Sequence, residues 1–180
     1  AINRLDRDTT GLLVIAKHLL AGCILSDQML NRQIHRQYRA IVCGKTEKEG
    51  IIDAPIGRTE DSTVLRRIDF EHGETARTRY RLLSYDEEKD LSYISLKLDT
   101  GRTHQIRVHM ASTGHPLLGD TLYHSDDKIS SCASFSRAAL HAWKVSFQHP
   151  FRDEMLLLEA PLPFDFRELV SLSGSDLLSI

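Results

Sequence analysis

Residues 4–11 (RLDRDTTG) concentrate groups that can do chemistry into one charged turn. Asp6 stands between two arginines, and opposite charges this close favour the ionised carboxylate. An ionised and oriented carboxylate can act as a nucleophile or as a general base. The same spacing fits a solvated turn in which Asp8 or Thr9 caps main-chain groups. The spacing of these residues alone leaves both interpretations open.

Residues 100–109 (TGRTHQIRVH) form a second candidate site, at the predicted start of a helix. If Thr103 caps that helix, His104 and Arg107 lie three residues apart on one face. The N-terminus of a helix presents main-chain N–H groups and a partial positive charge, which together suit an anion. A polar helix start whose apolar residues enter the core explains the pattern equally well.

Two strand-like segments carry basic side chains. Residues 36–40 (RQYRA) place Tyr38 between arginines, where it could stack on a base while the cations hold phosphate. Cross-strand packing of a half-buried tyrosine is the alternative. In residues 75–85 a period of two sends three arginines to one face, either to bind phosphate or to pair with Glu71 and Glu74 in solvent. These arginines are Arg77, Arg79 and Arg81.

The chain as a whole has the length and composition of one globular domain. Its 180 residues are 41% hydrophobic and 27% charged, which excludes a disordered chain. No apolar run approaches the ~20 residues that a membrane helix needs. The net charge of −2 is weak evidence against a nucleic-acid partner. However, residues 1–45 carry seven basic and three acidic side chains, so an anionic partner would bind this part of the chain.

The spacing of cysteines and histidines indicates neither a disulfide framework nor a metal site. The three cysteines, Cys23, Cys43 and Cys132, lie far apart. An odd and sparse set of this kind is typical of reduced thiols in a cytosolic protein. The nine histidines show no HExxH spacing, and no CxxC pair occurs.

Predicted strands outnumber predicted helices, and short turns join most of them. The apolar run at residues 12–16 is typical of a buried strand. Residues 63–70 and 75–85 are expected to pair through a turn at Gly73. Further strands are expected at residues 36–43, 50–57, 92–99, 140–148 and 155–159, helices at 19–33, 103–112 and 163–172, a loop at 124–136 and a tail at 173–180. This order favours an α+β fold with a mainly antiparallel sheet and flanking helices.

Four segments in this order are far more specific than any one alone. They are residues 4–17 (RLDRDTTGLLVIAK), 36–44 (RQYRAIVCG), 98–123 (LDTGRTHQIRVHMASTGHPLLGDTLY) and 139–150 (ALHAWKVSFQHP). Together they closely resemble the RluA-type RNA pseudouridine synthases, and the resemblance covers nearly the whole chain. It implies the pseudouridine synthase fold, an α+β domain with a mixed, mainly antiparallel sheet and an RNA cleft. It also implies that residues 1–180 are the catalytic domain without its N-terminal part.

The resemblance further implies a reaction and a set of site residues. Uridine in RNA would be isomerised to pseudouridine on a flipped-out nucleotide, without cofactor or metal. Asp6 matches the catalytic aspartate, whereas Asp8 does not. Tyr38 matches the tyrosine that packs against the uracil, and Arg107 the basic residue that pairs with the catalytic aspartate. The residues expected to bind RNA are Arg4, which enters the RNA stack, Ile106, which lines the pocket, and Arg7, Arg102 and His104.

The partner implied by the resemblance is RNA, with no membrane partner and a cytoplasmic location. Large-subunit ribosomal RNA is favoured because residues 101–109 and 139–143 look most like the rRNA-modifying members, with tRNA as the alternative substrate. The sequence does not choose among attack of Asp6 on ribose C1′, removal of the 2′ proton and addition to the base. Two other functions remain: a non-catalytic RNA-binding module of the same fold, and a hydrolase that uses Asp6 and Asp8 on a glycosidic bond.

Overall fold

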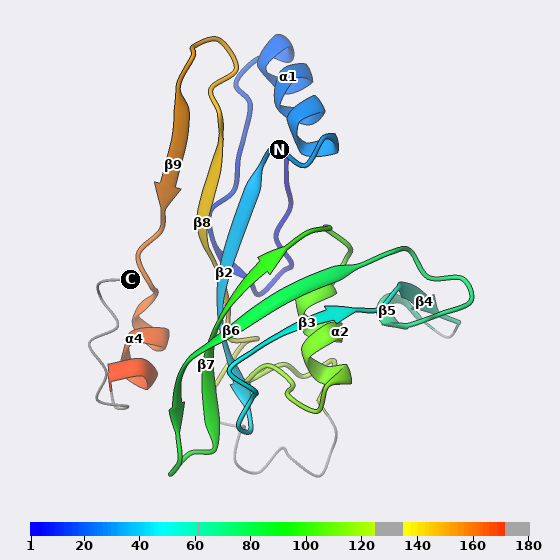
Figure 1. The fold of residues 1–180 in the computed structure, drawn as a ribbon, viewed down its shortest axis with the longest axis vertical. Helices are drawn as coiled ribbons and strands as arrows, with labels where there is room; N and C mark the ends of the chain where they lie inside the picture. The colour runs from blue at the N-terminus through cyan, green and yellow to red at the C-terminus, as the bar shows by residue number, and fades with distance from the viewer. Residues whose placement is uncertain (61, 125–134, 172–180) are drawn as a thin grey trace.

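A mixed, mainly antiparallel sheet dominates the computed structural model, which describes residues 1–60, 62–124 and 135–171 (Figure 1). Its seven strands run in the order β1-β8-β2-β7-β6-β3, with β9 also paired to β8. Among the strands of the described residues, only β1 and β8 pair in parallel. The strands are β1 (Thr10–Gly11), β2 (His35–Cys43), β3 (Glu49–Asp53), β4 (Ile56–Thr59), β5 (Ser62–Ile68), β6 (Arg77–Asp86), β7 (Leu91–Leu98), β8 (Leu140–Gln148) and β9 (Met155–Glu159), and the helices are α1 (Leu19–Leu30), α2 (Gln105–Ser112) and α4 (Phe164–Ser171). The predicted α+β class is confirmed.

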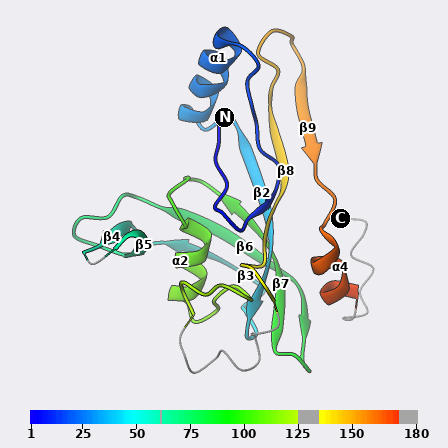
Figure 2. The same cartoon turned by 180° about the vertical axis from the view of Figure 1, so that it is seen from behind.

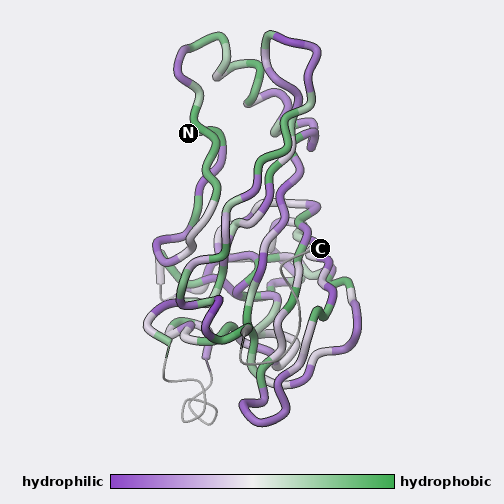
Figure 3. Tube along the Cα trace, turned by 90° about the vertical axis from the view of Figure 1, so that its left-hand side faces the viewer, coloured by the Kyte–Doolittle hydropathy of each residue, from purple (hydrophilic) through white to green (hydrophobic). Residues whose placement is uncertain are grey.

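The middle of the sheet is buried on both faces. Because successive side chains of a strand point to opposite faces, Val42 packs toward Met110 of α2, whereas Ile41 packs toward Phe166 of α4. Figure 2 shows these two helices from behind the molecule. Hydrophilic turns cap the ends of the long strands, as the purple segments of Figure 3 show. Helix α2 therefore packs against the face of the sheet that also carries Tyr38.

The strand at residues 63–70 does not have its predicted partner. β5 pairs with β4 in a separate two-stranded sheet that projects from the main body (Figure 1). β6 pairs instead with β3 on one side and β7 on the other, so both of its edges are occupied. The expected hairpin of residues 63–70 and 75–85 is therefore wrong, although the chain does turn where Gly73 donates to the Asp69 carbonyl (3.0 Å).

The three arginines of β6 share its outward face, as the period of two predicted. Arg77 forms an ion pair with Asp53 (Nε–Oδ2 3.1 Å), and Arg79 forms one with Asp99 (Nη2–Oδ2 3.1 Å). The partners are aspartates beside the strand rather than the glutamates at positions 71 and 74. These pairs are partly exposed, so they contribute little stability, about 0–1 kcal/mol each.

The apolar run at residues 12–16 is not the predicted buried strand. Strand pairing ends at Gly11, and the segment continues in extended form with Val14 buried but Leu13 and Ile15 exposed by 42% and 63%. The main chain of Val14 is bonded to the start of the chain, where its carbonyl accepts from the Ile2 N–H (2.8 Å). The segment is therefore half-buried, with one apolar face open.

Helix α1 begins where expected and ends three residues earlier, at Leu30. Its buried residues are Ala21, Leu25 and Gln28, whereas Leu20 is 61% exposed. None of the helices in the described part of the chain is long and apolar enough to cross a bilayer. The predicted loop at 124–136 and tail at 173–180 lie mostly or wholly outside the described residues.

The prediction that all three cysteines are reduced thiols holds for one of the two described cysteines. Cys23 is a free, exposed thiol as predicted. Cys43, which is buried, is disulfide-bonded, so the prediction is wrong for this residue. Cys132 lies outside the described residues. The spacing of three isolated cysteines gave no signal for a pairing that depends on the fold.

Candidate active site

Residues 3–11, here called the aspartate loop, are held at both ends, by the following segment at one end and by the sheet at the other. At the start, the Val14 N–H donates to the Asn3 Oδ1 (2.8 Å). At the end, Thr10 lies in β1, and its Oγ1 is 2.9 Å from His141 Nδ1 of β8. Hydrogen bonds therefore hold the loop at both of its ends, and one of these bonds is to a strand of the central sheet.

A close approach of two main chains fixes the end of this loop. Gly11 has a φ of +110°, and a Cβ there would lie 2.2 Å from the Ala142 carbonyl oxygen. Only glycine combines this conformation with this contact. Within the loop, the Thr9 N–H donates to the Asp6 carbonyl (3.0 Å) and closes a turn around Asp6.

Arg137 connects the aspartate loop to the C-terminal helix. Its guanidinium forms a two-pronged bond with Asp165 of α4 (2.9 and 3.0 Å) and donates through Nη1 to the Asp8 carbonyl (3.3 Å). The rings of Phe135 and Phe166 lie 5.2 and 5.4 Å from its Cζ. Bidentate bonding and ring packing restrict the arginine, so it supports the main chain of the loop at a defined place.

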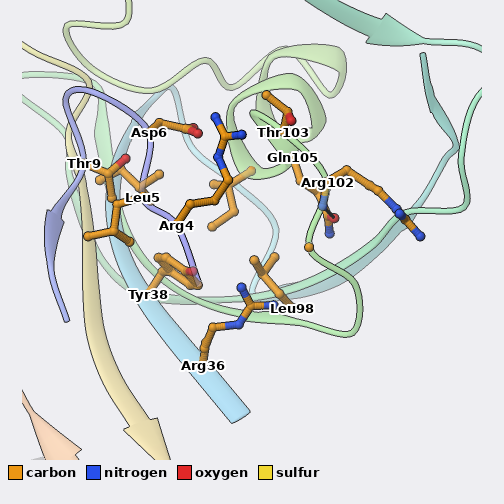
Figure 4. Close-up of a pocket in the computed structure, with 13 residues that line it drawn as sticks. Arg4, Leu5, Asp6, Thr9, Arg36, Tyr38, Leu98, Arg102, Thr103 and Gln105 are labelled. Atoms are coloured by element: carbon orange, nitrogen blue, oxygen red, sulfur yellow. Dashed lines mark hydrogen bonds between the residues drawn. The ribbon is translucent and has the colours of Figure 1, made fainter. Parts of the chain in front are cut away.

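Asp6 lines a pocket between the aspartate loop, β2 and the segment before α2 (Figure 4). Its cavity volume is about 80 Å³, well below the ~300–1,000 Å³ usual for small-molecule sites, so the pocket is small in this structure. The apolar lining comprises Leu5, Tyr38, Leu98, Ile106 and Leu140, and the basic lining comprises Arg4, Arg36 and Arg102. A carboxylate, apolar side chains and arginines thus line one space, with the Arg102 side chain extending away from Asp6 (Figure 4).

A larger groove adjoins the pocket and shares its three basic residues. Its cavity volume is about 1030 Å³. Its lining also includes the basic residues Arg32, His35, Arg77 and Arg79, and the two carboxylates Asp53 and Asp99. A groove lined mainly by one sign of charge attracts a polymer of the opposite sign. Residues from the first part of the chain contribute to it, as the charge distribution predicted.

The charge of Asp6 affects the pKa of three side chains: Tyr38, His104 and Arg107. Burial raises the pKa of Tyr38, Arg36 opposes this rise, and Asp6 adds to it. Burial lowers the pKa of His104, and Asp6 opposes that shift. Tyr38 comes from β2 and His104 is the residue before α2, so the charge of Asp6 acts on side chains from two elements.

Arg107 pairs with Asp120 rather than with Asp6. Its Nε donates to Asp120 Oδ2 and its Nη2 to Oδ1, both at 2.7 Å, and the two side chains are 5% and 0% exposed. Burial acts to lower the pKa of Arg107, but the bonds and charge of Asp120, together with the charge of Asp6, outweigh burial and raise it. A fully buried carboxylate requires a partner, and Asp120 is more deeply buried than Asp6.

The remaining predicted residues take three different positions. Arg102 lies at the rim, where it donates to the Thr75 carbonyl (3.1 Å) and pairs with Glu74. Arg7 is exposed on the aspartate loop and is not among the lining residues of the pocket or groove. His104 lies behind the lining, with Nδ1 2.7 Å from the Tyr123 hydroxyl.

Helix α2 begins at Gln105. The prediction that Thr103 caps this helix is wrong. His104 is the N-cap residue, in the left-handed region (φ 57°), and its side chain makes no capping bond. The missed residue is Gln105, which is 2% exposed and makes four hydrogen bonds. It accepts from the Thr100 hydroxyl and the Arg102 N–H, and it donates to the Arg77 carbonyl and the Thr78 hydroxyl, at 2.8–3.0 Å. It thereby fixes the pocket wall to β6, and nothing in local spacing distinguishes it from a surface glutamine.

The described residues contain no group of three or more His, Cys, Asp or Glu side chains placed to hold a metal ion.

The sheet, the aspartate loop and the pocket together define an α+β protein that places a carboxylate beside arginines and a buried tyrosine. The sequence model of the family described as RNA pseudouridylate synthase matches residues 1–112. The chain therefore belongs to the RNA pseudouridylate synthase family, and its relatives confirm the RluA type that the sequence resembles.

Among the similar proteins are two bacterial ones. The chain is 45% identical over 169 residues to the uncharacterized RNA pseudouridine synthase YhcT of Bacillus subtilis, covering 93% of this chain and 54% of that protein. It is 45% identical over 173 residues to the ribosomal large subunit pseudouridine synthase D of Nitrosomonas europaea, covering 94% and 49%. The chain thus spans about half the length of the curated relatives it matches.

A solved structure agrees with the fold. Human RNA Pseudouridylate Synthase Domain Containing 1 superposes with a TM-score of 0.79 at 28% identity, covering 91% of this chain and 69% of that one. The predicted pseudouridine synthase fold is confirmed.

Proposed function

We propose that this chain isomerises uridine to pseudouridine in RNA, with large-subunit ribosomal RNA as its substrate. The proposal depends most on one observation: the Asp6 carboxylate lies beside Tyr38 in a pocket that adjoins a groove lined by arginines. The relatives named for the large ribosomal subunit support the choice of RNA. tRNA is the alternative substrate.

The proposed reaction exchanges one bond to the ribose for another. The bond from uracil N1 to ribose C1′ breaks, a bond from C5 to C1′ forms, the C5 hydrogen leaves as a proton, and N1 takes up a proton. The exchange involves no net oxidation or reduction, and we assign it no cofactor or metal. The target base must first leave its stack, at a cost of a few kcal/mol. Asp6 acts on C1′, on the 2′ proton or on the base, and each route uses a carboxylate next to the bound nucleoside.

We assign the other residues by their positions around Asp6. Tyr38 and Ile106 supply the apolar surface on which the uracil packs. Arg4 and Arg102 bind RNA at the pocket, and Arg7 does so from the exposed side of the aspartate loop. Arg107 and His104 act from behind the pocket, where the charge of Asp6 reaches both.

We further propose that residues 1–180 work as one catalytic domain and that they do so in the cytoplasm. The cytoplasmic assignment rests on ribosomal RNA as the substrate rather than on the cysteines.

The release of tritium from 5-tritiated uridine in rRNA and tRNA transcripts tests the proposal. We expect release by the unaltered chain and a loss of about 1,000-fold or more in Asp6→Asn. The matched control is Asp8→Asn, two residues away in the same loop, which should retain its rate within a factor of about three because its side chain is exposed. Equal losses in both variants would contradict the role of Asp6. RNA binding without release by any of the three would favour the non-catalytic module instead.

A further inference from the structure

Arg36 lies where the pocket and the groove meet, and its side chain lines both. It stands two positions before Tyr38 on β2, so the two side chains project from the same face of the strand. Figure 4 shows both among the residues around the pocket. The Arg36 guanidinium also lies so close to Gly101 that a Cβ on this glycine would be 2.9 Å from Nη2. Arg36 therefore spans the space between β2 and the turn before α2.

The charge of Arg36 has no carboxylate partner in the described part of the chain. Three other arginines that line the groove do form ion pairs with carboxylates. They are Arg77, Arg79 and Arg102. Arg36 is half-buried, and its Nε has no hydrogen-bond partner among the described residues. Since a buried N–H without an acceptor is uncommon in native proteins, an anion bound at this junction would complete the site.

The guanidinium of Arg36 also acts on Tyr38. Burial raises the pKa of Tyr38, and the charge of Arg36 together with a hydrogen bond from it opposes this rise. The two side chains are thus near neighbours at one end of the pocket. An anion bound by Arg36 is therefore held beside the ring on which the uracil is proposed to pack.

The shape of a nucleotide indicates which anion this is. When a base enters the pocket beside Tyr38, the phosphates attached to its ribose stay at the mouth, because burying an unpaired charge is costly. Three arginines are shared by the pocket and the groove. Arg4 is exposed, and Arg102 is exposed and already paired with Glu74. Arg36 is the half-buried one without a carboxylate.

We propose that Arg36 is a specificity-determining residue that binds the phosphodiester next to the flipped uridine, at the junction of the pocket and the groove. The inference rests on the proposed function, since it takes the pocket to hold the uracil. Arg36 thereby selects a uridine whose backbone is charged, and it holds that backbone while the base lies against Tyr38. It takes no part in making or breaking bonds.

The experiment is a cycle of single changes in the protein and in the RNA. Tritium release from rRNA and tRNA fragments first locates the target uridine. RNAs are then made with a neutral methylphosphonate in place of the phosphodiester on its 5′ or its 3′ side. For the unaltered chain, we expect one of the two to lower kcat/KM about 30-fold, the usual effect of losing a charge-assisted hydrogen bond. Arg36→Gln should lower kcat/KM similarly on normal RNA, and the methylphosphonate should then cost it less than about threefold.

Two variants serve as controls. Arg81→Gln removes an exposed arginine of β6 that is not among the groove-lining residues. It should keep kcat/KM on normal RNA within about twofold and should respond to the methylphosphonate as the unaltered chain does. Arg36→Lys tests whether the contact is to phosphate. Because lysine binds phosphate as a point charge, this variant should still lose about tenfold with the methylphosphonate.

Three outcomes would contradict these proposals, each in a different way. If Arg36→Gln and the methylphosphonate lower kcat/KM independently, Arg36 supports Tyr38 or the fold and does not bind this phosphate. If neither methylphosphonate affects the unaltered chain, the assignment is overturned and the proposed function stands. No tritium release by the unaltered chain would overturn the proposed function, and the assignment with it. If Arg36→Gln does not fold by circular dichroism, Arg36→Met takes its place, because it keeps an apolar stem without the charge.

Discussion

Asp6 and Asp8 differ by two positions in one loop, and their surroundings separate their roles. Asp6 is half-buried in the lining of the pocket, where its charge acts on Tyr38. Asp8 is exposed, and its carbonyl accepts a hydrogen bond from Arg137. One aspartate thus supplies a carboxylate to the pocket, whereas the main chain of the other helps to hold the loop.

Arg36 gives a prediction at the same scale. It lines both the pocket and the groove, and its guanidinium lies so close to Gly101 that a Cβ there would be 2.9 Å from Nη2. We expect Arg36→Gln to weaken RNA binding about tenfold at moderate salt and to reduce the slope of log Kd against log salt by roughly 0.7–0.9, as for one lost phosphate contact. Binding titrations at several salt concentrations measure both.

The control for this prediction is Arg81→Gln. Arg81 is an exposed arginine of β6 that is not among the groove-lining residues. Its slope should match that of the unaltered chain. A similar change of slope in both variants would show that only total charge matters, not the position of Arg36.

At the scale of elements, the end of the aspartate loop depends on Gly11. A Cβ there would meet the Ala142 carbonyl at 2.2 Å, and φ is +110°. We expect Gly11→Ala to lower the free energy of unfolding by about 3 kcal/mol or more, from backbone strain plus a displaced β1–β8 pairing. Urea unfolding measures this loss, and tritium release should fall with it.

Gly114 provides the matched comparison. It also has a positive φ, +82°, but a Cβ there would meet nothing within 4 Å. Gly114→Ala should therefore cost only the backbone strain, about 1–2 kcal/mol. Equal losses at the two positions would mean that contact with β8 does not constrain the loop.

The sequence predicted an element correctly where the hydrophobic pattern of that element alone was sufficient. The strand of residues 92–99 alternates cleanly, and the structure has β7 at Leu91–Leu98 with Ile94 and Leu96 fully buried. The partner of β5 could not be predicted, because pairing depends on which edges other strands occupy. For the same reason residues 12–16 looked like a buried strand, although only one of their faces packs.

The sequence predicted the residues of the candidate site only where they belong to a recognisable motif. The four-segment resemblance picked out Asp6, Tyr38 and Ile106, and all three line one pocket. Asp120 and Gln105 were missed, because their contacts become visible only when α2 and its flanking turns are in place. An aspartate that ends an apolar stretch and a glutamine at a helix start are too common to indicate such roles.

At the scale of the whole molecule, two buried histidines and one half-buried histidine make stability depend on pH. Burial lowers the pKa of His104, His109 and His141. The unfolded chain, with histidine pKa near ~6.5, therefore binds more protons than the folded one below this value. The free energy of unfolding should be fully present above about pH 7 and should decrease as the pH falls toward 5. The Asp69 and Asp86 carboxyls, whose pKa main-chain hydrogen bonds lower, contribute at more acid pH.

His109 allows one part of this dependence to be isolated. It is fully buried, with Nδ1 2.8 Å from the Thr78 hydroxyl and Nε2 2.9 Å from the Ala54 carbonyl. In His109→Gln an amide can make similar bonds but does not titrate. Urea unfolding between pH 7.5 and 5 should show a shallower slope, by up to one proton or about 1.4 kcal/mol per pH unit. An unchanged slope would show that His109 does not contribute to the pH dependence of the free energy of unfolding.

The supports of the aspartate loop lie almost a whole chain away from it. Thr10 is bonded to His141 across 131 positions, and Asp8 to Arg137 across 129. During synthesis at roughly 5–20 residues per second, the loop leaves the ribosome many seconds before these partners exist. Such non-local contacts also form late in folding. A nascent or truncated chain that ends before residue 137 therefore carries Asp6 without these two anchors, and the aspartate loop gains its supports only after β8 has been made.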